Sequence, residues 1–313
     1  MKVVVTGAAG KLGSLVCRHL VHAGHEVIGL DPRRGVNVPA GVEIIAADIR
    51  KRTAEEVFRS RKPDAVIHMA TMAEGRVSRD ERERINLQGT RALFDHCHNY
   101  GVKSLVFIGR HTFYGAAADA PLYRKVDDPP RAIHRYPELA DLVAADLYAG
   151  SALWRYPEIH TSVLRICYTL GPMKHGTLAH YLKGPKVPMA LGFDPLFQII
   201  HEDDVVAAIC LALEKQIRGV FNVTGPPPLP LSALIEEAGR EVVALPAGIL
   251  RRVQGRFGLP RLARGAIAHL QHPVIIDGKR FVEATGFEYA FDDEVAIRAF
   301  ATGTGTGHPA PRR

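Results

Sequence analysis

Three glycines near the N-terminus, Gly7, Gly10 and Gly13, have the spacing of a loop that binds phosphate. They lie in the segment TGAAGKLG, between an apolar run that predicts a strand and a pattern that predicts a helix. Glycine permits a tight turn and a close approach of the backbone to a pyrophosphate, and the free N–H groups at a helix start favour an anion. The segment therefore predicts a dinucleotide-binding loop rather than a purely structural turn.

Asp31 follows the second predicted strand, at a distance from this loop that suits an adenosine ribose. A carboxylate there can accept hydrogen bonds from ribose hydroxyls, which favours NAD, and it would repel a 2′-phosphate. Arg33 and Arg34 follow it closely, and a guanidinium can hold that phosphate. We expect NAD in preference to NADP.

A tyrosine with a lysine four residues later could carry out acid–base chemistry, but the chain has no such pair. The ordinary pKa of tyrosine is about 10, so a tyrosine needs a neighbouring ammonium to act as a base near neutral pH. None of the nine tyrosines has lysine at the fourth following position; Tyr136, the best placed, is followed there by Ala140. Pro137 suits a first helical turn, whose dipole would lower the pKa of Tyr136 less than a lysine would. His111 and His134 are alternative proton carriers, although a surface or packing role is favoured for each.

These candidate residues must be positioned by a fold, and the alternation of apolar runs with helical patterns predicts which one. The runs predict strands at 2–7, 25–31, 42–48, 64–70, 104–109 and 160–167, and the helices are expected at 11–24, 53–60, 79–100 and 136–156. Continuous apolar strands between helices indicate an α/β fold, a Rossmann-type doubly wound parallel sheet with a smaller C-terminal substrate lobe. We expect residues 1–170 to form the cofactor-binding domain, with 196–224 returning to it, 171–195 and 225–300 to form the lobe, and 301–313 to be a flexible tail.

The composition of the 313 residues excludes several other classes of protein. The chain is 47% hydrophobic and 23% charged, as expected of a globular protein, and no apolar run reaches the length of a membrane span. The net charge of +7 is scattered, without the basic stripe of a nucleic-acid binder. The four cysteines are far apart in apolar segments, which indicates reduced thiols in a cytoplasmic protein without a metal site.

Together the motifs resemble the extended short-chain dehydrogenase/reductase family, in particular its NAD-dependent epimerase/dehydratase branch, from Met1 to about Phe300. The segments that carry the resemblance are TGAAGKLG, Asp48-Ile49, VIHMAT (66–71), NLQGT (86–90), FYG (113–115), LRICYTLGP (164–172), IHEDDVVAAI (200–209) and VIIDGKRFVEATGFEYA near the C-terminus. The glycine loop and the resemblance imply that NAD would be contacted by Thr6, Gly7, Ala9, Gly10, Lys11, Leu12, Gly13, Asp31, Arg33, Asp48, Ile49, Met69, Ala70, Thr71 and Asn86.

The resemblance also implies a catalytic centre, and here the chain departs from the family. The family uses a Tyr-x-x-x-Lys pair and a Ser or Thr hydroxyl, but the hydroxyl position, four residues before Tyr114, holds Arg110. Arg110 could hold a substrate carboxylate or phosphate, or it could pair with an acid or the cofactor and do no chemistry. Thr112 is the nearest hydroxyl. We name Tyr136, Arg110 and Thr112 as the candidate catalytic residues.

Two functions remain open from the sequence. The first is an NAD-dependent enzyme with an atypical centre, acting on a sugar nucleotide or a similar small anionic substrate. The second is a catalytically inactive cofactor-binding protein with a regulatory or scaffold role, since two members of a catalytic unit are altered together. A homodimer through the helices at 79–100 and 136–156 is a further expectation from the family.

Overall fold

A parallel sheet forms the centre of the molecule. The computed structural model describes residues 1–33, 38–72, 77–253, 255, 256 and 258–304. The sheet has the order β12-β7-β5-β4-β1-β2-β3 and all its pairs are parallel. Its strands are β1 (Lys2–Thr6), β2 (Glu26–Asp31), β3 (Val42–Ala46), β4 (Ala65–His68), β5 (Ser104–Arg110), β7 (His160–Ile166) and β12 (Gly219–Val223). The order reverses between β1 and β4, which is the switch point at which doubly wound sheets bind ligands, so the predicted fold class is confirmed.

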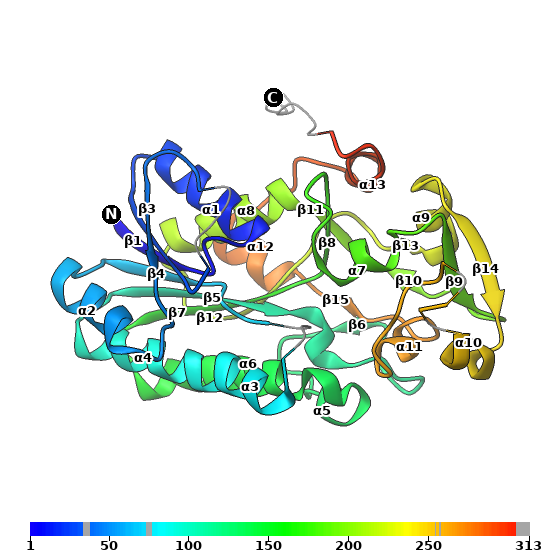
Figure 1. Ribbon diagram of the computed structural model, residues 1–313, viewed down its shortest axis with the longest axis horizontal. Coiled ribbons are helices and arrows are strands. Elements are labelled where there is room, and N and C mark those ends of the chain that lie inside the picture. Colours follow the sequence, from blue (N-terminus) through cyan, green and yellow to red (C-terminus); the bar gives the residue numbers. More distant parts are fainter. Residues whose placement is uncertain (34–37, 73–76, 254, 257, 305–313) are drawn as a thin grey trace.

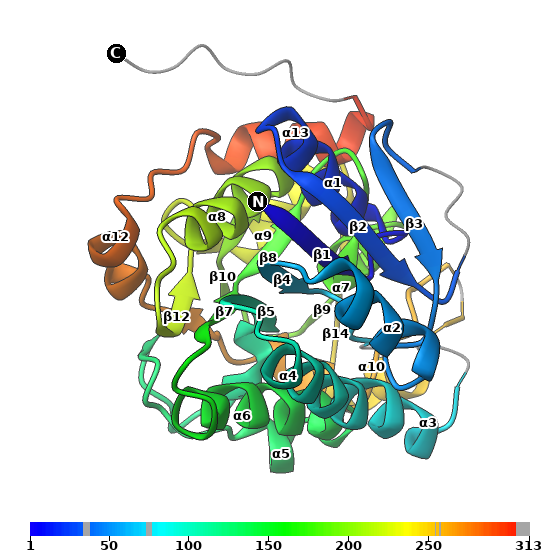
Figure 2. The same cartoon turned by 90° about the vertical axis from the view of Figure 1, so that its left-hand side faces the viewer.

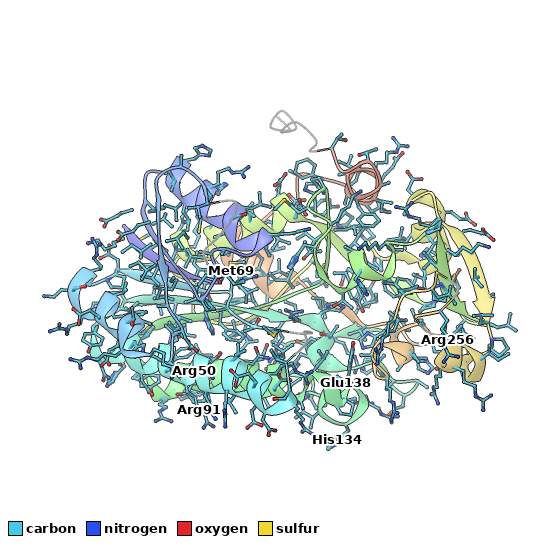
Figure 3. The ribbon with its side chains drawn as sticks, in the orientation of Figure 1. Arg50, Met69, Arg91, His134, Glu138 and Arg256 are labelled. Carbon is cyan, nitrogen blue, oxygen red and sulfur yellow. The ribbon has the colours of Figure 1, made fainter. Side chains whose placement is uncertain are left out.

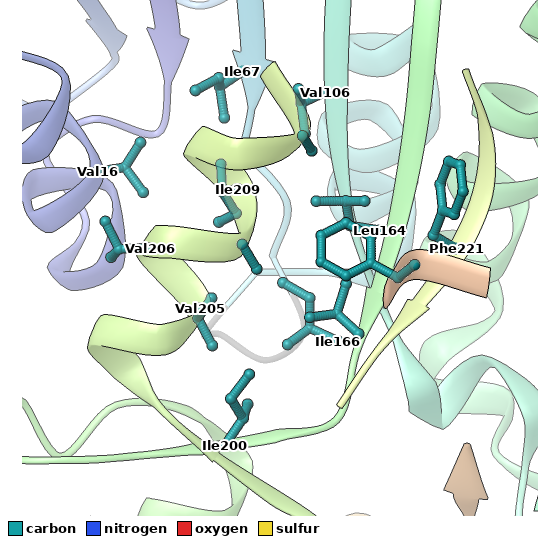
Figure 4. Close-up of a cluster of buried hydrophobic side chains, with 14 of the residues drawn as sticks. Val16, Ile67, Val106, Leu164, Ile166, Ile200, Val205, Val206, Ile209 and Phe221 are labelled. Atoms are coloured by element: carbon teal, nitrogen blue, oxygen red, sulfur yellow. The ribbon is translucent and has the colours of Figure 1, made fainter. Parts of the chain in front are cut away.

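Helices cover both faces of this sheet, as Figures 1 and 2 show. On one face lie α1 (Lys11–His22) and α8 (Glu202–Glu214), and on the other α2 (Arg52–Arg61), α4 (Gly89–Asn99) and α6 (Ala140–Arg155). The strands are nearly continuous in apolar residues because both of their faces are buried. Figure 4 shows the core on the first face, where Val205 and Ile209 of α8 lie toward Leu164 and Ile166 of β7, and Val206 lies toward Val16 of α1.

Two predicted helices are interrupted, each at an identifiable place. The helix expected at 79–100 consists of α3 (Arg79–Glu83), a π-helical turn η1 (Arg84–Gln88) and α4. The helix expected at 136–156 begins only at Ala140, after α5 (Ala132–Arg135) and a 3-10 turn η3 (Pro137–Leu139). Pro137 disfavours helical geometry at the residue before it, and Tyr136 accordingly has φ −139° and ψ 68°.

The C-terminal part forms a third hydrophobic cluster of its own, beside the carboxyl ends of β5 and β7 (Figure 1). Its strand pairs are short: β8 (Tyr168–Leu170) with β11 (Ile199–His201), β9 (Lys186–Ala190) with β14 (Glu241–Leu245), β10 (Leu196–Phe197) with β13 (Leu229–Pro230), and β15 (Ile275–Ile276) with β6 (Tyr123–Arg124). Its helices are α7 (Gly176–Tyr181), α9 (Leu231–Glu237), α10 (Ala247–Val253), α11 (Ala266–His269) and α13 (Asp293–Thr302), while α12 (Lys279–Thr285) packs on β12. Among the described residues, no helix is both long and apolar enough to cross a bilayer.

Candidate active site

The glycine loop between β1 and α1 has the backbone geometry of a phosphate cradle. Gly7 has φ +75°, and a Cβ there would lie 2.9 Å from the carbonyl carbon of Met69, the residue labelled at the end of β4 in Figure 3. A Cβ on Gly13 would overlap the carbonyl oxygen of Gly7. Gly10 precedes α1 and has no side chain to cover the free N–H groups of its first turn. The loop therefore fits a pyrophosphate, which needs both the close approach and the exposed N–H groups.

Asp31 is 1% exposed at the end of β2 and already carries several hydrogen bonds. Its carboxylate accepts from the Ala9 N–H at 3.2 Å and from the Arg33 side chain, with Nε to Oδ1 and Nη2 to Oδ2 both at 2.9 Å. The carboxylate thus lies next to the loop, as predicted for a ribose-binding acid, with a guanidinium across it. Arg34 lies outside the described residues.

The other residues predicted to contact NAD differ in how exposed they are. Asp48 is half-exposed, and ion pairing with Arg50 lowers the pKa of its carboxyl. Ile49 and Leu12 pack against the two cores, and Thr71 lines the pocket described below. In contrast, Thr6 is buried: its hydroxyl accepts from the N–H groups of Met69 and Ala70, each at 3.2 Å.

Asn86 is also buried, in the π-helical turn, and it holds the chain after β4. Its side-chain oxygen accepts from the Met72 N–H at 2.7 Å, and its amide donates to the Met72 carbonyl at 2.8 Å and to Asp141 at 2.6 Å. Thr6 is linked to the same region through His68, whose ring contacts the hydroxyls of Thr6 at 2.7 Å and Thr90 at 3.0 Å. These buried hydrogen bonds hold the ends of β1 and β4 and the segment after β4 in place.

A pocket opens at the carboxyl end of β5. It brings together two of the candidate catalytic residues, Arg110 and Thr112, with Thr71 from the end of β4. Its opposite wall is apolar and consists of Leu139, Leu142 and Val143 around the start of α6. A fixed positive charge beside an apolar wall suits an anionic group withdrawn from water.

Tyr136, the third candidate, does not line this pocket. It is 4% exposed, in the link between α5 and η3. Its ring fills the space over Gly265, where a Cβ would lie 2.5 Å from the ring atom Cγ, and it meets the His269 ring edge-on at 5.7 Å. His111, directly after Arg110, is 2% exposed, whereas His134 is exposed on α5, at the lower edge of Figure 3.

A second set of charged groups links the glycine loop to the segment after β8. The Lys11 ammonium donates to the Met173 carbonyl at 2.6 Å, and the Met173 N–H donates to Glu202 at 3.0 Å. Glu202 is 3% exposed, and burial raises the pKa of its carboxyl to about 7. Loss of water, then the positive charges of Arg110 and Lys11, lower the pKa of His175, so these three side chains lie close to one another.

Tyr168, His269 and Glu202 lie near the crevice but are not singled out by the sequence. Tyr168 and Glu202 occur inside LRICYTLGP and IHEDDVVAAI, so their positions in those segments were a usable signal. His269 lies in the lobe and carries no motif. Within the described ranges, no group of three His, Cys, Asp or Glu side chains is arranged to hold a metal ion.

Comparisons with known proteins show which family the chain matches. The model of the NAD dependent epimerase/dehydratase family matches residues 3–224. An uncharacterised protein of Mycobacterium tuberculosis is 28% identical over 93% of the chain and 82% of its own length. The 3-diazoavenalumate denitrifying reductase of a Streptomyces species is 28% identical over 85% of the chain and 92% of its own length.

Among solved structures, UDP-glucose 4-epimerase of Thermus thermophilus in complex with NAD is 26% identical, with a TM-score of 0.74 over 97% of this chain and 98% of that one. The resemblance predicted from the motifs is confirmed by the family match, and NAD as cofactor is confirmed at the level of the family. The roles of individual site residues remain predictions.

Proposed function

The chain belongs to the NAD dependent epimerase/dehydratase family, and we propose that it is an NAD-dependent enzyme that acts on a sugar nucleotide or a similar small anionic substrate. The observation that carries the proposal is that the glycine cradle and the Arg110 pocket lie at the same edge of the sheet, the cradle after β1 at the switch point and the pocket at the end of β5. A dinucleotide that lies with its pyrophosphate on Gly7–Gly13 and its adenosine ribose near Asp31 has its other end toward β5.

NAD and the residues of the pocket have different roles in the proposed reaction. When bound, NAD supplies a hydride donor or acceptor at its nicotinamide ring. Arg110 holds an anionic group of the substrate or stabilises negative charge that develops on its oxygen, and the Thr112 hydroxyl offers a hydrogen bond beside it. Leu139, Leu142 and Val143 keep water away from that place, which strengthens both interactions.

The substrate class follows from charge and from relatives. Lys11 and Arg110 are positively charged and lie close enough to His175 to lower its pKa, so this region is electropositive, which suits a diphosphate or a carboxylate. The Thermus relative is named for UDP-glucose, a nucleotide sugar. We infer that the substrate carries a comparable anionic group.

The test is a titration of the protein with NAD and with UDP-glucose, followed by melting temperature. A ligand that binds the folded state raises the free energy of unfolding, by about 2.7 kcal/mol at a hundredfold excess over Kd, and so raises the melting temperature. We expect NAD to raise it and UDP-glucose to raise it further, with Arg110→Ala reducing the second effect only. The absence of any shift with NAD would contradict the proposal.

A second candidate function is cofactor binding without turnover. It is favoured by Ala140 in place of a lysine four residues after Tyr136 and by Arg110 in place of the family's hydroxyl residue. It predicts that NAD and UDP-glucose bind without any exchange of hydride between them.

We also propose that the protein is a homodimer through α4 and α6. Trp154 is 85% exposed and Leu147 is 43% exposed; they are seven residues apart on α6 and so share one face of the helix. Light scattering should give twice the chain mass, and Trp154→Lys should give a monomer. A wild-type monomer would contradict this assembly.

A further inference from the structure

One short segment, residues 171–175, connects β8 to α7 and reaches from the glycine loop toward the Arg110 pocket; we call it the strap (Figure 1). At the glycine loop, the Lys11 ammonium donates to the Met173 carbonyl oxygen of the strap at 2.6 Å. Toward the pocket, the positive charge of Arg110 adds to loss of water in lowering the pKa of His175, so these two side chains are close. The strap therefore adjoins both the cofactor loop and the pocket.

The start of α8 holds the strap on a second side. The Glu202 carboxylate accepts from the Met173 N–H at 3.0 Å, and a Cβ on Gly171 would lie 2.5 Å from Glu202 Cγ. Within the strap, the Lys174 N–H donates to the Gly171 carbonyl oxygen at 3.1 Å. Few hydrogen bonds thus hold this segment, and the bond from Lys11 is the one that ties it to the glycine loop.

The backbone of the strap has a conformation that depends on these contacts. Lys174 has φ +50°, a left-handed conformation that is disfavoured for residues other than glycine, and Gly176 has φ +93°. The side chains of Lys174 and His175 are exposed, so little apolar surface is buried here. Such segments persist only where their surroundings hold them, and they open more readily than the core.

Lys11 is placed to contact the strap and NAD at once. It is the first residue of α1, directly after Gly10 of the glycine loop, and its side chain is exposed. A pyrophosphate on this loop brings anionic oxygens to the same end of α1. An ammonium has three donors, and it binds an anionic oxygen more strongly than a carbonyl. One ammonium can therefore hold the phosphate and the Met173 carbonyl together.

We propose that Lys11 is a positioning residue that couples the two binding regions: with NAD on the glycine loop, the Lys11 ammonium is fixed between the pyrophosphate and Met173, and it holds the strap closed beside the Arg110 pocket. The inference rests on the proposed function and deepens it, because it sets the order of binding. NAD binds first, and the substrate then binds against the closed strap. Without NAD, the Lys11 side chain is less restrained and the strap opens more often.

Amide hydrogen exchange measures how often the strap opens. The Met173 and Lys174 N–H groups exchange when their bonds to Glu202 and Gly171 break. In the wild type, saturating NAD should slow exchange at these two amides by about tenfold. Lys11→Met loses the ammonium, so it should bind NAD and show no slowing. Lys11→Arg keeps a cation with several donors and should show the slowing again.

A lysine far from the loop provides the control. Lys215 is exposed directly after α8, and Lys215→Met should match the wild type with and without NAD. Equal exchange with and without NAD in the wild type would overturn the inference, and so would an undiminished slowing in Lys11→Met. The first of these outcomes is measured on the wild type, so it does not depend on the folding of a variant.

The order of binding has its own readout in calorimetric titrations with UDP-glucose. The ratio of its Kd without NAD to its Kd with NAD should be about ten in the wild type and about one in Lys11→Met. Equal ratios in the two proteins would overturn the inference. Failure of the proposed function is distinguishable, because NAD would then leave the melting temperature unchanged; a raised melting temperature with unchanged exchange in the strap contradicts the role of Lys11 alone.

Discussion

Gly13 has no room for a side chain, because a Cβ there would overlap the carbonyl oxygen of Gly7. Gly13→Ala must therefore push α1 away from the loop. We expect NAD to bind at least tenfold more weakly and the free energy of unfolding to fall by about 1–3 kcal/mol, as in overpacked sites. Calorimetry and thermal melting measure the two effects. Gly248→Ala is the control, since a Cβ at Gly248 has nothing within 4 Å, and comparable losses in it would argue against a specific cradle.

We expect the single residue Asp31 to determine whether NAD or NADP binds more tightly. Its carboxylate can accept from ribose hydroxyls, while the Arg33 guanidinium beside it can hold a 2′-phosphate. Asp31→Asn removes the negative charge and leaves the guanidinium, so NAD should bind about tenfold more weakly while NADP binds as well or better. Parallel titrations with the two dinucleotides give the ratio. A ratio that does not change would show that this carboxylate does not contact the ribose.

At the residue scale, the sequence predicts those residues whose roles follow from their spacing along the chain. Gly7, Gly10, Gly13 and Asp31 follow from their distances along the chain. The contacts of His111 could not be predicted this way, because the Tyr168 ring reaches it from a distant segment and His269, from a third segment, contacts Tyr168. Clusters of side chains from distant segments depend on tertiary packing and have no recurring pattern in the sequence.

Two elements, β7 and α6, are tied by a buried ion pair. The Arg165 guanidinium lies 2.7 Å from Asp146, with both side chains about 5% exposed or less, and it also donates to the Tyr114 hydroxyl at 3.0 Å and the Val126 carbonyl at 3.0 Å. Asp146→Ala leaves the guanidinium buried without its anion, so we expect a loss of about 3–5 kcal/mol in the free energy of unfolding. Denaturant melting measures it. Ser151→Ala on the exposed side of α6 should cost under about 0.5 kcal/mol, and a similar small cost for Asp146→Ala would contradict the buried pair.

The start of α8 should make stability depend on pH. Burial raises the pKa of Glu202 to about 7, above its value of 4.5 in the unfolded chain. The folded state therefore holds the proton more tightly, and the contribution of Glu202 to stability is greatest below about pH 4.5 and is lost as pH rises through about 7. Glu202→Gln cannot lose a proton and keeps an acceptor for the Met173 N–H.

Relative to this variant, the wild type should lose about 3 kcal/mol between pH 4.5 and 7.5. Urea melts at several pH values measure the difference. Glu214→Gln, exposed at the other end of α8, is the control. A constant difference across the range would show that Glu202 is not protonated in the folded protein.

At the element scale, the predicted strands and most helices agree with the structure because their apolar periods are strong. The two interrupted helices show that the apolar periodicity does not predict where a helix is broken. Pro137 signals a helix start, yet its restraint on Tyr136 displaces the helix to Ala140. The π-helical turn at Arg84–Gln88 turns Asn86 toward Met72 and Asp141, and that choice depends on partners far along the chain.

For the whole molecule, the doubly wound parallel sheet followed from the alternation of elements and from the resemblance. The lobe was harder to predict, because its strands are two to five residues long and pair across long separations. Its Pro-rich breaks indicate boundaries without indicating partners. The substrate, which we expect to contact the lobe, is the part of the function that the sequence reveals least.

We propose that hydride exchange occurs in a centre that has Arg110 and no Tyr-x-x-x-Lys pair. The most direct measurement is a single-turnover experiment, in which the protein with bound NAD is mixed with UDP- and dTDP-sugars and the absorbance of reduced nicotinamide is recorded. We predict that at least one sugar reduces bound NAD, and that Arg110→Ala abolishes the signal while NAD still binds. Bound NAD that stays oxidised with every sugar would contradict the account and favour a cofactor-binding protein without turnover.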